Sequence, residues 1–185
     1  MHREGKPVSK NARRTYVRRF NKLLSGVTYG DVERASRWYS DARMVAQEVA
    51  DIAGCTLEQG ASIVSAYSPR VTWARNIVLA LAHARGDIQP SLGTSRRAAI
   101  RAQEHGFDAL NGPKTNAFAR AIAGDDDAVV IDVWMCRAAG VDPDRLTPSL
   151  YRDIAQSVRT VAKQHGCTPV TMQALIWGRV RGGMD

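Results

Sequence analysis

Long hydrophobic runs are missing from this sequence. No apolar stretch approaches the roughly 20 residues that a helix needs to cross a bilayer. The N-terminus is basic, but no apolar segment follows it, so the pattern of a secretory signal is absent. We therefore expect a soluble, cytoplasmic protein without a membrane partner.

Cysteine is also scarce. The three cysteines, Cys55, Cys136 and Cys167, are odd in number and widely spaced, which suits neither a disulfide framework nor a CxxC zinc site. Cys136 and Cys167 lie in apolar helical patterns, where we expect free buried thiols. The four histidines show no HExxH or paired-ligand spacing. The sequence thus predicts no metal and no other cofactor.

Positive charge is present in excess and is concentrated at one end. Lys+Arg 26 against Asp+Glu 18 gives +8, of which residues 1–22 carry +7 (eight basic side chains and one acidic). We expect a basic arm over residues 1–24 and a single helical domain over 25–185. Tyr16 and Phe20 are spaced four apart, so the arm can pack on the domain and present arginines to a polyanion; the alternative is a solvated, partly disordered leader. The arm lacks a strong apolar face, which favours nucleic acid over membrane as its partner; its candidate contacts are Arg13, Arg14, Arg18 and Arg19.

Helical patterns follow one another after the arm. Thr56 and Gln59 form a capping-box pattern, and two threonine-proline pairs, Thr147-Pro148 and Thr168-Pro169, place an N-cap residue before a proline. The expected helices cover residues 31–52, 56–67, 72–86, 94–106, 113–124, 133–139 and 147–166, with a last one from 168. Residues 129–131 alone are strand-like. At 44% hydrophobic the chain can bury one sizeable core, so we predict an all-α fold, a compact bundle of two lobes around a central cleft.

The most informative segment covers residues 106–140. Residues 110–114 (Leu-Asn-Gly-Pro-Lys) indicate a tight turn that enters a helix, where Gly112 allows unusual backbone angles and Pro113 suits the helix start. Asp132 opens the next helix, 18 residues after Lys114. Both can face one cleft if the two helices fold back on each other. Taken singly, however, Asp132 is a good N-cap and Lys114 a solvated lysine at a helix start.

This segment resembles the helix-hairpin-helix DNA glycosylase superfamily, and most of all its compact phage-type members. The matching positions are Leu110, Gly112 and Lys114 of the hairpin, and Asp132 after the apolar pair 130–131. Residues 65–69 (Ser-Ala-Tyr-Ser-Pro) are similar to the family's segment that lines the base pocket. The hairpin is two residues shorter than the family pattern, and Trp134 stands where the family often has histidine. No four-cysteine cluster closes the chain, so no iron–sulfur cluster is expected.

The resemblance implies a role for each matching residue. A base to be excised is first extruded from the duplex into a pocket. Tyr67, Trp73 and Trp134 are the candidates for stacking on this base. Each tryptophan taken alone, however, is more typical of a hydrophobic core. Asp132 would stabilise positive charge on the sugar, and Lys114 would either attack C1′ as an amine or contact a phosphate as an ammonium. The candidate contacts to the DNA backbone are the turn residues Asn111, Gly112 and Thr115, together with Arg70.

The first hypothesis is therefore a DNA N-glycosylase-type enzyme that acts on an extruded base, with or without Schiff-base lyase activity. A second keeps the scaffold but assigns it to a phage pathway that builds hypermodified bases. A third is a non-catalytic DNA-binding protein that uses the basic arm and the hairpin. The sequence does not indicate which base of DNA is recognised.

Overall fold

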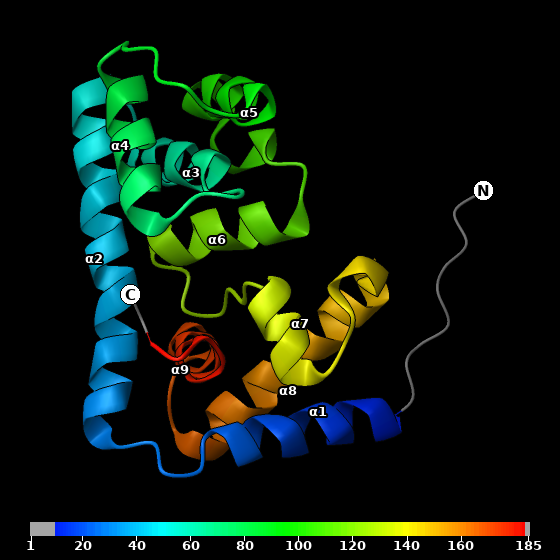
Figure 1. Ribbon diagram of the computed structural model, residues 1–185. Coiled ribbons are helices and arrows are strands. Elements are labelled where there is room, and N and C mark those ends of the chain that lie inside the picture. Colours follow the sequence, from blue (N-terminus) through cyan, green and yellow to red (C-terminus); the bar gives the residue numbers. More distant parts are fainter. Residues whose placement is uncertain (1–9, 184–185) are drawn as a thin grey trace. The chain divides into compact units, whose positions relative to one another are not determined.

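The computed structural model describes residues 10–183 and contains only helices there. Nine α-helices and two short 3₁₀-helices form within this part, shown in chain order in Figure 1. No strand forms among these residues, and the strand-like segment 129–131 is a connection between helices. The predicted all-α class is confirmed.

Contacts within the chain divide it into two compact units. Of the described residues, unit 1 contains 10–36 and 129–183, and unit 2 contains 37–128. The first boundary falls inside α2 (Tyr29–Ala53). The expected division at residue 24 groups the chain differently, because residues 10–24 belong to unit 1; residues 1–9 of the expected arm lie outside the described residues.

Unit 1 is built from both ends of the chain. It contains α1 (Lys10–Leu23), α7 (Val133–Ala139), η2 (Pro143–Arg145), α8 (Pro148–His165) and α9 (Pro169–Arg181). Helix α1 packs on α8 and also contacts α7 and α9 (Figure 1). Its apolar side chains Tyr16 and Phe20 are buried, as expected for an arm that packs on the domain. The alternative of a solvated leader is therefore wrong for residues 10–23.

Polar contacts fix α1 to α8 at both ends. Arg13 Nε donates to the buried carboxylate of Asp153, and Asn21 Nδ2 donates to Gln164 Oε1 at 3.1 Å. Removing one partner of a buried ion pair leaves an uncompensated charge and is strongly destabilising. Arg13 is thus engaged within the fold itself.

The threonine-proline pairs begin helices as predicted. The hydroxyl of Thr147 accepts from the amide of Leu150 at the start of α8, and that of Thr168 accepts from Thr171 at the start of α9, each at 3.2 Å. A side-chain oxygen at this position satisfies an amide that has no partner inside the helix.

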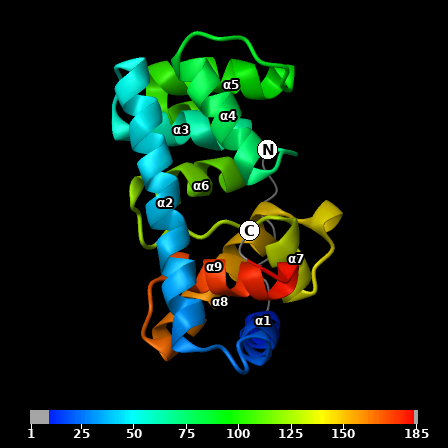
Figure 2. The same ribbon diagram turned by 60° about the vertical axis from the view of Figure 1, so that its left-hand side comes forward.

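Unit 2 surrounds α3 (Leu57–Tyr67), which begins with the predicted capping box of Thr56 and Gln59. Helix α3 packs against α4 (Trp73–Ala84), α5 (Gly93–His105), η1 (Gly106–Ala109) and α6 (Pro113–Ala123), and Figure 2 shows it among them. It also lies very close to α2, because a Cβ on Gly60 would be 2.3 Å from the carbonyl oxygen of Ala46. Glycine is required there by this close approach of two backbones.

Two expectations of detail are wrong. Helix α5 begins at Gly93 rather than at Thr94 or Ser95, and its N-cap residue makes no side-chain hydrogen bond. Cys167 lies in the connection between α8 and α9 and is only half-buried, whereas Cys136 is buried as expected.

Candidate functional site

The turn before α6 is fixed by hydrogen bonds from three directions. Ser65 Oγ of α3 donates to the carbonyl of Thr115 at 2.7 Å, and Asn116 Nδ2 donates to the carbonyl of Phe107 at 3.0 Å. Within the turn, Thr115 Oγ1 donates to the carbonyl of Gly112 at 3.0 Å. The start of α6 is therefore held rigidly by its neighbours, which is what a pre-organised binding loop requires.

Gly112 does not have the unusual backbone angles expected of it. Its φ of −94° and ψ of 135° are ordinary extended values, which any residue adopts. What glycine provides here is space, because a Cβ would lie 3.2 Å from Thr115 Oγ1. As the N-cap residue it offers no side-chain acceptor to the first amides of α6.

Lys114 lies in the first turn of α6 and is half-buried. Within unit 2 no carboxylate pairs with its ammonium group. Asn111 on the same turn is exposed, and so is Arg70, which has the left-handed φ of 61° at the turn between α3 and α4. All three side chains are at least partly accessible, and the roles that the resemblance implies for them stay predictions.

Asp132 is the N-cap of α7, in agreement with the prediction. Its Oδ1 accepts from the amides of Trp134 at 3.0 Å and Met135 at 2.9 Å. Its Oδ2 accepts from the indole Nε1 of Trp177 on α9 at 3.0 Å. The carboxylate is half-buried, and three N–H donors fix its orientation.

Trp177 and Tyr151 are two residues that the sequence analysis missed. The hydroxyl of Tyr151 on α8 donates to the carbonyl of Val129 at 3.0 Å and accepts from the amide of Ile131 at 3.2 Å. It thereby fixes the backbone directly before Asp132. Burial raises the pKa of Tyr151 to about 12, so it remains a neutral donor. No spacing signal points to either residue, since Trp177 is 45 positions from its acceptor.

The three expected stacking residues lie in different surroundings. Trp73 packs against Trp38 and Phe118, with ring centroids 5.3 and 6.5 Å away, so it belongs to an aromatic cluster of unit 2. Tyr67 is 5% exposed, and its hydroxyl bonds with His83 Nδ1 at 3.2 Å. Trp134, in unit 1, is half-buried beneath the guanidinium of Arg137, 4.5 Å from the ring centroid. Tyr67 and Trp73 therefore have largely structural contacts, and Trp134 keeps part of its ring accessible.

The arginines of α1 differ in how far they are engaged. Arg13 is occupied by Asp153, and the guanidinium of Arg19 lies against Gly140 at the end of α7, where a Cβ would be 2.3 Å away. Arg14 and Arg18 are exposed. Arg14 and Arg18 are therefore the best candidates on this helix for contacts with a polyanion.

Lys114 and Asp132 belong to different units, so the cleft that they were expected to share remains a prediction. Within residues 10–183, no group of three or more His, Cys, Asp or Glu side chains is placed to hold a metal ion. In the same part of the chain, no helix has the length and apolar character to cross a bilayer.

A family model, described as a family of unknown function (DUF7178), matches residues 3–184. The chain belongs to the DUF7178 family. No curated protein and no solved structure matches the chain.

The match to DUF7178 covers both units, including the hairpin before α6 and the capped carboxylate of α7. Both candidate sites are thus parts of the DUF7178 region and not of a segment added to it. Because the family's description names no activity, any function must be argued from these sites.

Proposed function

We propose that the protein is a DNA N-glycosylase-type enzyme that cleaves the bond between a base and its deoxyribose. Asp132 is its carboxylate and Lys114 its amine. The proposal is supported by the resemblance of residues 110–132 to the helix-hairpin-helix glycosylases. The observation that carries it is the hydrogen bond from Trp177 to Asp132 Oδ2.

That hydrogen bond goes beyond what a helix cap needs. An N-cap uses one side-chain oxygen, and Asp132 Oδ1 alone accepts both amides of the first turn of α7. The second oxygen is held by an indole from another helix, so the whole carboxylate plane is fixed. Among residues 10–183, Trp177 is the one donor to Oδ2, which keeps acceptor capacity for a ligand. Pre-oriented charge of this kind stabilises a cation without reorganisation at the moment of reaction.

The chemistry assigns a separate task to each group. The base departs with the electron pair of the C1′–N bond and takes up a proton, and positive charge develops on the sugar beside the Asp132 carboxylate. A water molecule then adds its hydroxide to C1′ and releases a proton. If the deprotonated amine of Lys114 attacks C1′ in place of water, the adduct loses a proton from nitrogen, and opening of the sugar ring by cleavage of the C1′–O4′ bond gives a Schiff base and a C4′ hydroxyl. Loss of a proton from C2′ then drives elimination of the 3′ phosphate, which breaks the C3′–O bond and cuts the strand.

Replacing Asp132 with asparagine tests the carboxylate. Asparagine caps helices as well as aspartate does, so α7 keeps its cap while the negative charge is lost. We expect Asp132→Asn still to bind DNA duplexes that contain damaged or modified bases. It should form abasic sites at least about a hundredfold more slowly than the wild type, because loss of one such electrostatic contact lowers the rate by a factor of about 10²–10³. Asp142→Asn is the matched control, because Asp142 caps η2 in the same way and is exposed. Undiminished base release by Asp132→Asn would remove this carboxylate from the mechanism.

Borohydride trapping tests the amine. A Schiff base between Lys114 and the sugar would be reduced to a stable protein–DNA adduct, which Lys114→Ala should abolish. Lys163→Ala, which removes an exposed lysine of α8, controls for the loss of one positive charge. Equal trapping by Lys114→Ala would exclude Lys114 as the nucleophile. Absence of an adduct together with base release would assign the nucleophile to water.

The exposed arginines of α1 favour a second candidate, a DNA-binding protein without catalysis. Log affinity for duplex DNA would then fall by about 0.9 per log unit of salt for each neutralised phosphate. Replacing Arg14 and Arg18 with glutamine should flatten this slope. Deleting residues 1–22 is a poorer test, because it removes the buried Phe20 and the partner of Asp153. Release of free base from any duplex, measured by mass spectrometry, would exclude a purely binding role.

A further inference from the structure

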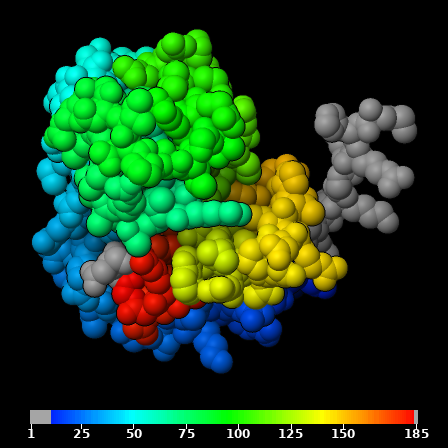
Figure 3. Space-filling view, turned by 45° about the horizontal axis from the view of Figure 1, so that its top comes forward, coloured from blue at the N-terminus to red at the C-terminus, as the bar shows by residue number. Residues whose placement is uncertain are grey.

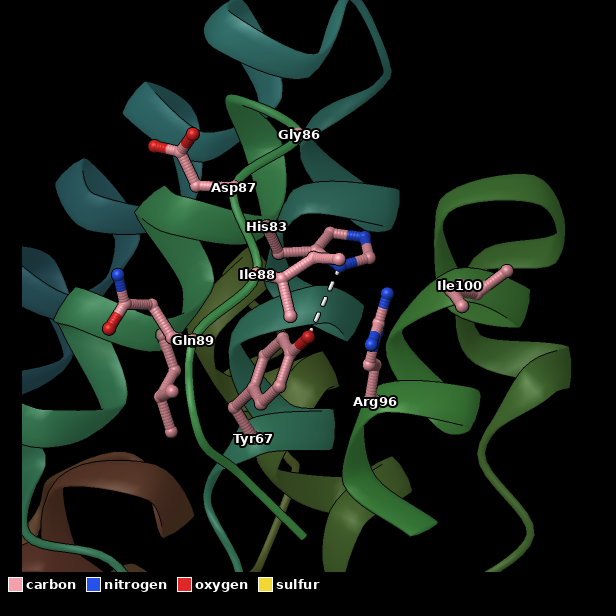
Figure 4. Close-up of a pocket in the computed structure, with 9 residues that line it drawn as sticks. Tyr67, His83, Gly86, Asp87, Ile88, Gln89, Arg96 and Ile100 are labelled. Carbon is pink, nitrogen blue, oxygen red and sulfur yellow. Dashed lines mark hydrogen bonds between the residues drawn. The ribbon is translucent and has the colours of Figure 1, made fainter. Parts of the chain in front are cut away.

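Unit 2 contains a small cavity that the proposed reaction does not use. Its volume is about 160 Å³, and its walls come from the end of α3, from α4, from the connection 86–92 and from α5 (Figure 4). This is enough space for several water molecules. It is below the 300–1,000 Å³ of pockets for drug-sized ligands and has room for one chemical group.

Two residues that line the cavity, Tyr67 and His83, belong to a chain of hydrogen bonds that ends at Gln103. The hydroxyl of Tyr67 and Nδ1 of His83 are 3.2 Å apart, and His83 Nε2 is 3.1 Å from Gln103 Oε1. In the tautomer with the proton on Nε2, His83 donates to Gln103 and accepts from Tyr67, so both ring nitrogens are used. Burial lowers the pKa of His83, and the nearby Arg96 lowers it further against the opposing effect of the Gln103 bond. His83 is therefore neutral at neutral pH.

Arg96 supplies the positive charge of the cavity. It extends from α5 toward the hydroxyl of Tyr67 and the ring of His83 in Figure 4. Asp87 also lines the cavity, yet it forms no ion pair with Arg96, and no other described carboxylate of unit 2 does so. An arginine without an anion, beside a neutral imidazole, offers N–H donors to a negatively charged ligand.

Two exposed isoleucines flank this cation. Ile88 is 71% exposed and Ile100 is 47% exposed, and both line the cavity. Ile88 lies in the connection before α5 and Ile100 on α5 itself. The green part of the chain, to which α5 belongs, is seen on the surface of unit 2 in Figure 3. A ligand that covered them would recover the free energy of burying apolar surface, about 25 cal/mol for each Å².

We propose that this cavity binds a nucleotide, with the phosphate on Arg96 and the sugar and base against Ile88 and Ile100. The planar fork of arginine matches phosphate oxygens in a bidentate manner. The same chemistry fits a free nucleotide and a nucleotide of a DNA strand. The site lies wholly within unit 2, and its occupancy requires no base release.

Titration with thymidine 5′-monophosphate, followed by amide NMR of the full chain, tests the proposal. We expect saturable shifts confined to the amides of residues 86–89 and of the first turns of α5, and tighter binding than for inorganic phosphate or thymidine alone. Arg96→Gln should weaken binding at least about tenfold, because it removes hydrogen bonds to a charged group. Arg97→Gln is the matched control: it removes the same charge from the same helix at a residue that is exposed but does not line the cavity.

The remaining outcomes divide clearly. Equal weakening of nucleotide binding by Arg96→Gln and Arg97→Gln would show general attraction to a basic surface and would overturn the proposal. The absence of saturable amide shifts with both the mononucleotide and a ten-residue oligothymidine would also overturn it. Tighter binding of the oligonucleotide identifies a strand as the source, and tighter binding of the mononucleotide identifies a free nucleotide. Loss of base release in Asp132→Asn leaves these results unchanged, so this site and the proposed reaction are tested separately.

Discussion

The hydrogen bond between Trp177 and Asp132 can be measured as a coupling free energy. Asp132→Ala removes the cap of α7, which costs about 1 kcal/mol, and leaves the half-buried indole N–H without an acceptor, which costs about 1 kcal/mol more. Trp177→Phe removes the donor and keeps most of the aromatic packing, so we expect a loss of about 1–2 kcal/mol. In the double variant the shared hydrogen bond is lost only once. The expected coupling is therefore about 1 kcal/mol.

Urea denaturation of the four proteins, followed by circular dichroism at 222 nm, gives this coupling from linear extrapolation. Circular dichroism is preferred to fluorescence because two of the four proteins lack Trp177. Asp132→Asn is an internal check, since it preserves the cap and should lose only the contact with Trp177. Independent sites are additive within about 0.3–0.5 kcal/mol. A coupling below about 0.5 kcal/mol would refute the idea that the indole fixes the carboxylate.

Three further predictions concern packing and titration. Burial raises the pKa of Tyr151 to about 12 from its usual 10. The contribution of this raised pKa to the free energy of unfolding is therefore complete below pH 10 and is lost as the pH rises toward 12. Urea denaturation at alkaline pH should show this loss in the wild type and a smaller loss in Tyr151→Phe. Gly60→Ala should lower the free energy of unfolding by about 1–3 kcal/mol, because its Cβ would lie 2.3 Å from the carbonyl oxygen of Ala46. Thermal melting should show this loss against a Gly30→Ala control, because Gly30 is also helical and a Cβ there would meet its nearest atom at 3.6 Å. Burial, reinforced by a nearby carboxylate, raises the pKa of the Cys136 thiol to about 11. A thiol-reactive probe at pH 8 should therefore label the half-buried Cys55 in the native protein and Cys136 only after unfolding. Prompt labelling of Cys136 in the native state would contradict its burial.

The helices could be predicted from the sequence because their signals are local. The cap of α8 depends on Thr147 and on an amide three residues later, and that of α3 depends on Thr56 and Gln59. Such interactions are visible in any short window of sequence. The start of α5 was misplaced because Leu92, its N-cap residue, gives no capping signal.

The contacts around the candidate sites are not local, and the sequence did not reveal them. Trp177 reaches Asp132 from another helix, and Tyr151 fixes the segment before Asp132 across 20 residues. Tyr67 was expected to stack on a base, whereas its hydroxyl is paired with His83, 16 residues away. Only tertiary packing decides such pairs, because no periodicity links their positions.

The order of the segments in unit 1 has a consequence for biosynthesis. Unit 2 is a continuous stretch, residues 37–128, and can fold as soon as it leaves the ribosome. Helix α1 is made first, yet its main partner α8 begins only at residue 148. Until then the apolar face of α1 has no native surface to cover it and stays accessible to chaperones. Unit 1 can be completed only after α9 has been synthesised.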